Sequence, residues 1–279
     1  MSNKEVYEKV TAKIMEKLSK GIVPWKKSWS CNDVAVNWGT QKPYRGINAL
    51  LLDAGEYATF NAVKAAGGRV NAGAKGHSVV FYQFIDKKDK DADIDEEEKM
   101  DRFMFTKLYT VFEINTQCTG LTSKRKNQTI VNPIEECEKV VAGYKTIPSI
   151  VYGNPAYSPA MDCMYMPHMN EFGSVQEYYA ALFHEMVHST GSKNRLDRQG
   201  IASFDYFGSD QYSKEELIAE TGAAMLCSMS GIETTMENSV AYLQNWMKKL
   251  ADDPRLIVTA ANMAQKACDY ITNNEYKSE

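Results

Sequence analysis

The chain has 279 residues, of which 44% are hydrophobic and 24% are charged, and its formal net charge is −4. This length predicts one large domain or two modest ones, and the balanced composition excludes a mainly disordered, collagen-like or coiled-coil chain. An overall acidic chain is also a poor partner for nucleic acid, provided that its charge is evenly spread.

The charge is not evenly spread. Residues 1–85 and 102–130 together carry a net charge of +10, residues 86–101 carry −5, and residues 131–279 carry −9. The segment 86–101 has almost no apolar side chain to bury, so we expect it to form a solvated acidic loop. The basic part therefore remains a candidate for binding an anionic partner.

The composition changes near Asn132 and Pro133, which predicts a boundary between two domains. We expect an N-terminal domain at residues 1–128 and a C-terminal domain at residues 129–279. No stretch approaches the eighteen or so apolar residues that span a bilayer, and the first ten residues are too charged for a signal peptide. The sequence therefore predicts a cytoplasmic protein with no membrane partner, and its six scattered cysteines predict reduced, mostly buried thiols.

The N-terminal domain is predicted to be α+β. An amphipathic helix is expected at residues 3–20 because Val6, Val10, Ile14 and Leu18 recur at helical spacing before Gly21. The remaining expectations are an irregular segment at 24–38, a short helix at 46–53, a helix capped by Thr59 that ends at Gly67, and β-strands at 77–85 and 102–114.

The C-terminal domain is predicted to consist mainly of helices. Asn132 and Pro133 open one helix, and Ser174 with Glu177 forms a capping-box pattern that opens another. Further helices are expected at about 213–229, 235–250 and 254–272, and strands at 147–152 and 163–167. The strand at 163–167 is interpreted as an edge that could pair with an extended substrate.

The predicted helix after Ser174 contains the motif HExxH, formed by His184, Glu185 and His188. Histidines four residues apart lie about 40° apart around a helix, so both imidazoles can reach one metal ion. Zinc lowers the pKa of its bound water and polarises a carbonyl, while the intervening glutamate can transfer the proton. The motif therefore predicts a Zn²⁺ site, with Glu185 as the catalytic base of amide hydrolysis.

A third protein ligand is needed, and two carboxylates are candidates. The sequence Glu216-Leu-Ile-Ala-Glu220 places Glu216 and Glu220 on one helical face. It resembles the ExxAD-type segment of the gluzincin metallopeptidases, and that resemblance implies Glu216 as the ligand and Glu220 as the group that orients a ligand histidine. Alternatively, Ser213 and Glu216 form a capping box and Glu220 binds the metal. His168 is either a substrate contact or a structural residue.

The N-terminal domain interleaves aromatic and basic residues. Exposed rings could stack on bases while cations contact phosphates, a combination suited to single-stranded nucleic acid. The alternative is that the tryptophans are core residues and the lysines only provide solubility. The candidates are Trp25, Lys26, Lys27, Trp29, Tyr44, Arg45, Arg69 and Lys75.

Ordered motifs resemble the ArdC-type antirestriction proteins. These are the Gly21–Trp25 segment, the run Tyr44-Arg45-Gly46-Ile47-Asn48, the glycine-rich segment 67–76, the stretch 109–121 and the run HEMVHSTG. The resemblance implies an N-terminal domain that binds single-stranded DNA without sequence specificity, with Asn48 among its binding residues. It further implies a C-terminal zincin-like metallopeptidase domain, a mobile genetic element as source, and protection of incoming DNA from restriction. The acidic loop and Ser189 depart from the family pattern.

Three hypotheses follow. In the first, the basic half binds single-stranded DNA and the acidic half is a zinc metallopeptidase that acts on a host protein or peptide. In the second, DNA is bound but the zinc site is structural and proteolytically inactive. In the third, the protein is a housekeeping peptidase that does not bind DNA.

Overall fold

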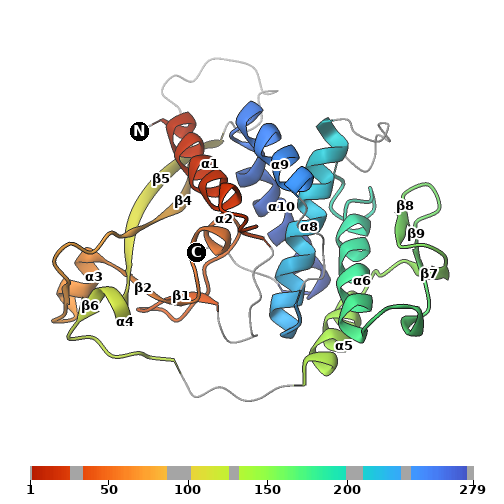
Figure 1. Cartoon of the computed structure of the whole chain (residues 1–279), viewed down its shortest axis with the longest axis horizontal. Coiled ribbons are helices and arrows are strands. Elements are labelled where there is room, and N and C mark those ends of the chain that lie inside the picture. Colours follow the sequence, from red (N-terminus) through yellow and green to blue (C-terminus); the bar gives the residue numbers. More distant parts are fainter. Residues whose placement is uncertain are drawn as a thin grey trace.

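The computed structural model of the chain describes residues 2–25, 34–86, 102–125, 132–198, 210–233 and 240–274. The N-terminal elements lie at the left of Figure 1 and the helix with the HExxH motif lies at the right, with the last helices between them. Several residues singled out above lie outside the described ranges: Lys26, Lys27, Trp29, Cys31 and residues 87–101 of the acidic segment. The structure confirms the α+β class, with helices and mixed sheets.

The N-terminal half contains α1 (Asn3–Ser19), β1 (Ala35–Asn37), α2 (Ile47–Leu51), β2 (Gly55–Thr59), α3 (Phe60–Ala65), β3 (Arg69–Val70), β4 (His77–Asp86), β5 (Arg102–Glu113), α4 (Ile114–Gln117) and β6 (Cys118–Thr119). Four strands form a sheet in the order β1-β2-β5-β4, in which only the β1–β2 pair is parallel. The two long predicted strands are confirmed as β4 and β5. The Thr59 cap is also confirmed, because the Thr59 side chain accepts a hydrogen bond from Ala62 N. The short strands β1 and β2 were not expected.

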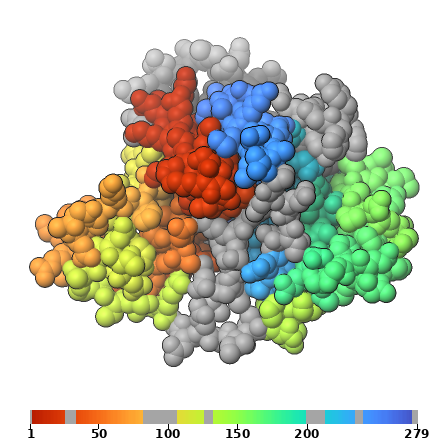
Figure 2. Space-filling model, in the orientation of Figure 1, coloured from red at the N-terminus to blue at the C-terminus, as the bar shows by residue number. Residues whose placement is uncertain are grey.

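Helix α1 connects the two halves of the molecule. Its predicted apolar face is buried, and Gly21 ends it with a φ of +75°, a conformation that glycine adopts without steric cost. The same hydrophobic core contains Val6 and Val10 of α1 together with Trp246 and Leu250 of α9 (Val240–Asp252). Figure 2 shows α1 in red lying directly beside α9 in blue. The N-terminal and C-terminal halves therefore share one core.

The C-terminal half contains α5 (Pro133–Gly143), β7 (Ser149–Tyr152), β8 (Ala156–Ser158), β9 (Cys163–Met166), η1 (Met169–Glu171), α6 (Val175–Ser189), α8 (Asp210–Ser230), α9 and α10 (Leu256–Ile271). The Asn132 cap is confirmed, because its side chain accepts a hydrogen bond from Ile134 N. Residues 126–131 lie outside the described ranges, so the boundary at residue 128 stays a prediction.

The interpretation of residues 163–167 as an edge strand is wrong. The three-stranded sheet has the order β7-β9-β8, so β9 pairs with β7 on one side and with β8 on the other. Both rows of its backbone hydrogen-bonding groups face neighbouring strands, and an extended peptide cannot add to it. Any pairing with a substrate would have to use β7 or β8.

Two further expectations can be compared with the described residues. Five of the six cysteines are described, and all five are free and buried, as the sequence predicts. None of the helices in the described ranges is both long enough and apolar enough to cross a membrane.

Candidate metal centre

Helix α6 carries both histidines of the HExxH motif. It begins after Ser174, whose hydroxyl accepts a hydrogen bond from Glu177 N at 3.1 Å. One helical turn separates His184 from His188, and the rings meet edge to face with their Nε2 atoms 3.0 Å apart. The helical spacing alone brings these two nitrogen atoms to a common point.

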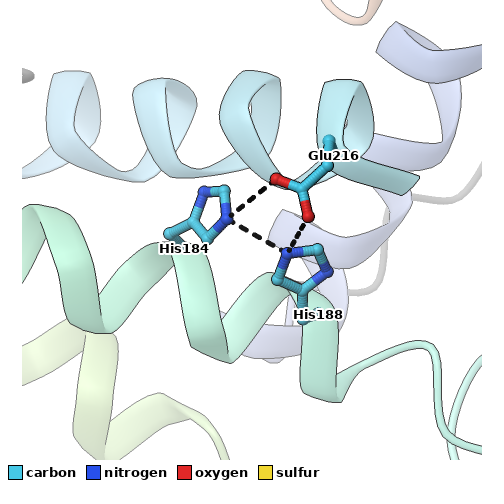
Figure 3. Close-up of side chains that lie close together, drawn as sticks. All are labelled: His184, His188 and Glu216. Carbon is cyan, nitrogen blue, oxygen red and sulfur yellow. Dashed lines mark hydrogen bonds and ion pairs between the residues drawn. The ribbon is translucent and has the colours of Figure 1, made fainter. Parts of the chain in front are cut away.

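Glu216 reaches the same point from α8. Its Oε2 atom lies 3.6 Å from His184 Nε2, and its Oε1 atom lies 3.5 Å from His188 Nε2 (Figure 3). The two helices approach closely because Gly222 on α8 has no side chain, and a Cβ there would lie 2.8 Å from Val187 on α6. Packing of α6 against α8 therefore brings the third side chain into place.

The arrangement fits a divalent metal ion. His184, His188 and Glu216 each offer one ligand atom, and these atoms lie within 4.8 Å of one another. Two ligands bound tetrahedrally at 2.0–2.1 Å are about 3.3 Å apart, close to the separations in the triad. Two neutral imidazoles and one carboxylate are also a donor set typical of catalytic zinc sites, which leave a fourth position open.

Electrostatics in the site favour a positive charge between the three side chains. Burial alone would lower the pKa of His188, but hydrogen bonds and charge from Glu215 and Glu216 outweigh it and raise this pKa to about 10. Burial would raise the pKa of Glu216, but the two histidines hold it far below its usual range. The carboxylates that stabilise a proton at this point also stabilise a bound cation.

A buried ion pair lies directly behind His188. Glu215 Oε1 is 3.4 Å from His188 Nδ1, and both Glu215 oxygens accept hydrogen bonds from Arg198, at 2.6 and 3.1 Å. Arg198 and Glu215 are only 7% and 4% exposed. Arg198 also donates to the Val187 carbonyl at 2.7 Å and the Thr190 hydroxyl at 2.6 Å, so it ties the end of α6 to α8. Neither residue is predicted from the sequence, because no motif links positions 198 and 215.

The role inferred for Glu220 needs correction. Its carboxylate accepts hydrogen bonds from Trp25 Nε1, at 3.1 Å, and from the Tyr242 hydroxyl. His188 Nδ1 faces Glu215, and His184 Nδ1 is buried with no hydrogen-bond partner among the described residues, so Glu220 orients neither ring through Nδ1. Glu220 is also not a member of the metal-ligand group found among the described residues.

The capping-box alternative for Glu216 is also wrong. Helix α8 begins at Asp210, so Ser213 lies within its first turns rather than before them. Glu216 therefore lies inside the helix, where its side chain is available to the histidines.

The other two candidates in this half lie in different surroundings. Glu185 is 6% exposed and follows His184 on α6. His168 is exposed, stacks on Tyr152 with ring centroids 4.8 Å apart, and does not belong to the metal-ligand group of the described residues. Glu185 is thus a buried residue next to His184 in the chain, and His168 is a surface residue.

The nucleic-acid candidates that the structure describes differ in their exposure and contacts. Trp25 is 1% exposed and its ring packs nearly perpendicular to that of Trp246, so no ring face is open to a base and its interpretation as a stacking residue is wrong. Arg45 forms an ion pair with Asp269, and Asn48 hydrogen-bonds to both N and O of Val80, so these two residues hold the fold together. Tyr44 is half-buried against Tyr57.

Only two of the described candidates are exposed. Arg69 and Lys75 lie on the surface at β3 and just before β4. The sequence could not separate them from the others, because composition does not report burial.

Comparisons with known proteins match two consecutive segments. Residues 4–112 match the N-terminal domain of the anti-restriction factor ArdC, and residues 135–263 match a zincin-like metallopeptidase family. The triad lies within the second segment, and the exposed candidates Arg69 and Lys75 lie within the first.

Relatives along the whole chain have different lengths. Two proteins named DNA primase TraC from Escherichia coli are 31% and 32% identical over 98% of this chain. They are much longer, so this chain spans only 28% and 20% of their respective lengths. The protein y4eC of Sinorhizobium fredii is 31% identical over 96% of this chain and is covered over 91% of its own length.

Two solved structures match the fold. One is the metal-free crystal structure of the antirestriction ArdC protein from the R388 plasmid, which is 32% identical in sequence and matches with a TM-score of 0.74. The match covers 96% of this chain and 97% of the ArdC chain. The chain belongs to the ArdC antirestriction family. The other is the Mn(II)-bound structure of the same ArdC protein, which is 33% identical in sequence and matches with a TM-score of 0.73. This match covers 97% of this chain and 99% of the ArdC chain.

Proposed function

We propose that this ArdC family member is an antirestriction protein of a mobile genetic element, which binds single-stranded DNA through its N-terminal half and carries a zinc metallopeptidase site. The observation that carries the peptidase assignment is the convergence of His184, His188 and Glu216, which are three protein ligands among the described residues, whereas a structural zinc site typically has four. The relative whose structure is Mn(II)-bound supports the binding of a divalent metal ion by this chain.

The catalytic roles follow from positions on α6 and α8. A zinc ion held by His184, His188 and Glu216 would lower the pKa of a coordinated water and would polarise the carbonyl of the substrate. Glu185 lies three residues before His188, so the two side chains are neighbours on the helix surface. The Glu185 carboxylate takes the proton of the attacking water and passes it to the leaving amine of a host protein or peptide. Glu216 and the two histidines hold the metal ion.

Binding of single-stranded DNA is supported by the distribution of charge. The N-terminal half is basic outside the acidic segment 86–101, although the whole chain has a net charge of −4. A similar chain also occurs within proteins named as DNA primases, which supports a role on DNA.

Replacing Glu185 with glutamine is expected to leave metal content and DNA affinity unchanged and to lower any peptidase rate by about 10²–10⁴-fold, because a positioned general base contributes about this factor. The measurements are metal content by elemental analysis, DNA affinity by fluorescence anisotropy, and protection of transferred DNA from a restricting host. Loss of protection makes hydrolysis part of the function.

The control for this experiment is Glu177→Gln, which changes a partly buried glutamate in the first turn of the same helix. Full protection by Glu185→Gln would instead support the second candidate function, in which the metal site is structural and protection depends on occupying the DNA strand.

The DNA-binding half of the proposal predicts a steep salt dependence. Affinity for an oligothymidylate should fall linearly on a log–log plot against salt concentration, with a slope of about −0.7 for each phosphate contact. A titration by fluorescence anisotropy across a salt series measures this slope. No detectable binding at low salt would refute DNA binding and leave a peptidase that does not act on DNA.

A further inference from the structure

The ribbon formed by β4 and β5 carries an aromatic pair that the sequence analysis did not single out. Phe81 on β4 is 54% exposed and Tyr109 on β5 is 45% exposed. Their ring centroids are 5.9 Å apart, and the rings meet at 88°. Large apolar side chains usually avoid water, so two adjacent exposed rings indicate a surface that binds something.

The register of the ribbon places a cation beside the two rings. Phe81 lies directly opposite Lys107, and Tyr109 lies opposite Val79. Directly opposed residues share a face of an antiparallel sheet, so Phe81, Tyr109 and the exposed Lys107 lie on the same face. We call these three residues the ribbon patch.

The opposite face of the ribbon is already used. Val80 belongs to the core that includes α1, and Leu108 packs against that core. The core that includes α1 therefore lies behind the ribbon patch. On the patch's own face Val79 is buried in a second, smaller core, so the ribbon patch is the exposed part of that face. The ribbon is visible at the left of Figure 1.

The edge of the ribbon is blocked to an added strand at this point. Strand β4 is the last strand of its sheet, but Asn48 accepts a hydrogen bond from Val80 N and donates one to Val80 O, both at 2.7 Å. These are the backbone groups that a peptide would need in order to extend the sheet beside Phe81. Recognition at the ribbon patch must therefore use side chains.

Exposed rings next to a cation match the chemistry of unpaired nucleic acid. Bases stack on aromatic faces without regard to sequence, and a neighbouring lysine attracts the phosphates. The basic charge of this half of the chain favours this polyanion over an apolar protein surface. Among the rings expected from the sequence to take this role, Trp25 is buried and Tyr44 is half-buried.

We propose that Phe81 and Tyr109 form the surface on which bases of single-stranded DNA stack, with Lys107 contacting the backbone. This inference rests on the proposed DNA binding and gives it a location. It also predicts a preference for single strands, because a base in a duplex has no free face to stack on the rings.

The test uses the full-length protein and a fluorescein-labelled oligothymidylate, with affinity measured by anisotropy across a salt series. Replacing both Phe81 and Tyr109 with alanine is expected to weaken binding at least tenfold and leave the salt slope unchanged, because stacking involves no phosphate charge. Lys107→Gln is expected to reduce the magnitude of the salt slope by about 0.7. Tryptophan at both ring positions should restore affinity.

The matched control is Phe60→Ala, because Phe60 is exposed to a similar extent but lies at the start of α3. Circular dichroism confirms that each variant folds. Base stacking on the ribbon patch is refuted if the double alanine variant binds DNA within twofold of the wild type, or if Phe60→Ala weakens DNA binding equally. If the wild type itself does not bind, the proposed function fails instead.

Discussion

Replacing His188 with alanine is expected to weaken divalent metal binding by at least about a hundredfold. Structural zinc sites with four ligands bind with about 10–16 kcal/mol, or roughly 3 kcal/mol per ligand, and 1.4 kcal/mol corresponds to a tenfold change in affinity. His188 supplies one of only three ligand atoms in the group. Competition with a fluorescent chelator measures the affinity directly.

Two controls make this result specific. His168→Ala removes an exposed histidine that stacks on Tyr152 and should bind metal like the wild type. Comparison of Glu216→Gln with Glu220→Gln separates the two carboxylates, and only the first should lose the metal. Wild-type affinity in His188→Ala would place the metal elsewhere, and loss only in Glu220→Gln would overturn the assignment of Glu216.

Replacing Arg198 with methionine is expected to lower the free energy of unfolding by about 3–5 kcal/mol, because it leaves the Glu215 carboxylate buried without its charged partner. Urea denaturation in the presence of a chelator measures this loss without a contribution from the metal. A matched exposed pair is Lys20 with Glu16, and Lys20→Met should leave the free energy of unfolding almost unchanged.

The same pair should also affect metal affinity. Groups that orient a ligand histidine typically contribute about 10–100-fold to metal affinity, and Glu215 faces Nδ1 of His188. The double variant Arg198→Met with Glu215→Met replaces both charges by apolar groups, so it should regain stability but not metal affinity. If metal affinity returns together with stability, the pair only supports the fold. If Arg198→Met costs less than about 1 kcal/mol, the buried pair is not the stabilising contact described above.

Local signals in the sequence predicted most helix starts correctly. Thr59, Asn132 and Ser174 each accept a hydrogen bond from a backbone N–H near the start of the following helix. Such a contact involves neighbouring residues only, so the sequence contains all the information it needs. The short strands β1, β2 and β8 were not predicted, because three to five residues become a strand only when a partner strand lies beside them.

The sequence by itself determined that His184 and His188 share one face of a helix, because α-helical periodicity is a property of the backbone. It also determined that basic and acidic residues divide between the two halves. Only the tertiary structure decided that Glu215, rather than Glu220, lies against His188, because that contact depends on how α6 packs on α8 and on the position of Arg198. Burial, too, is set by packing between distant segments, which is why Trp25 is enclosed while Phe81 and Tyr109 are exposed.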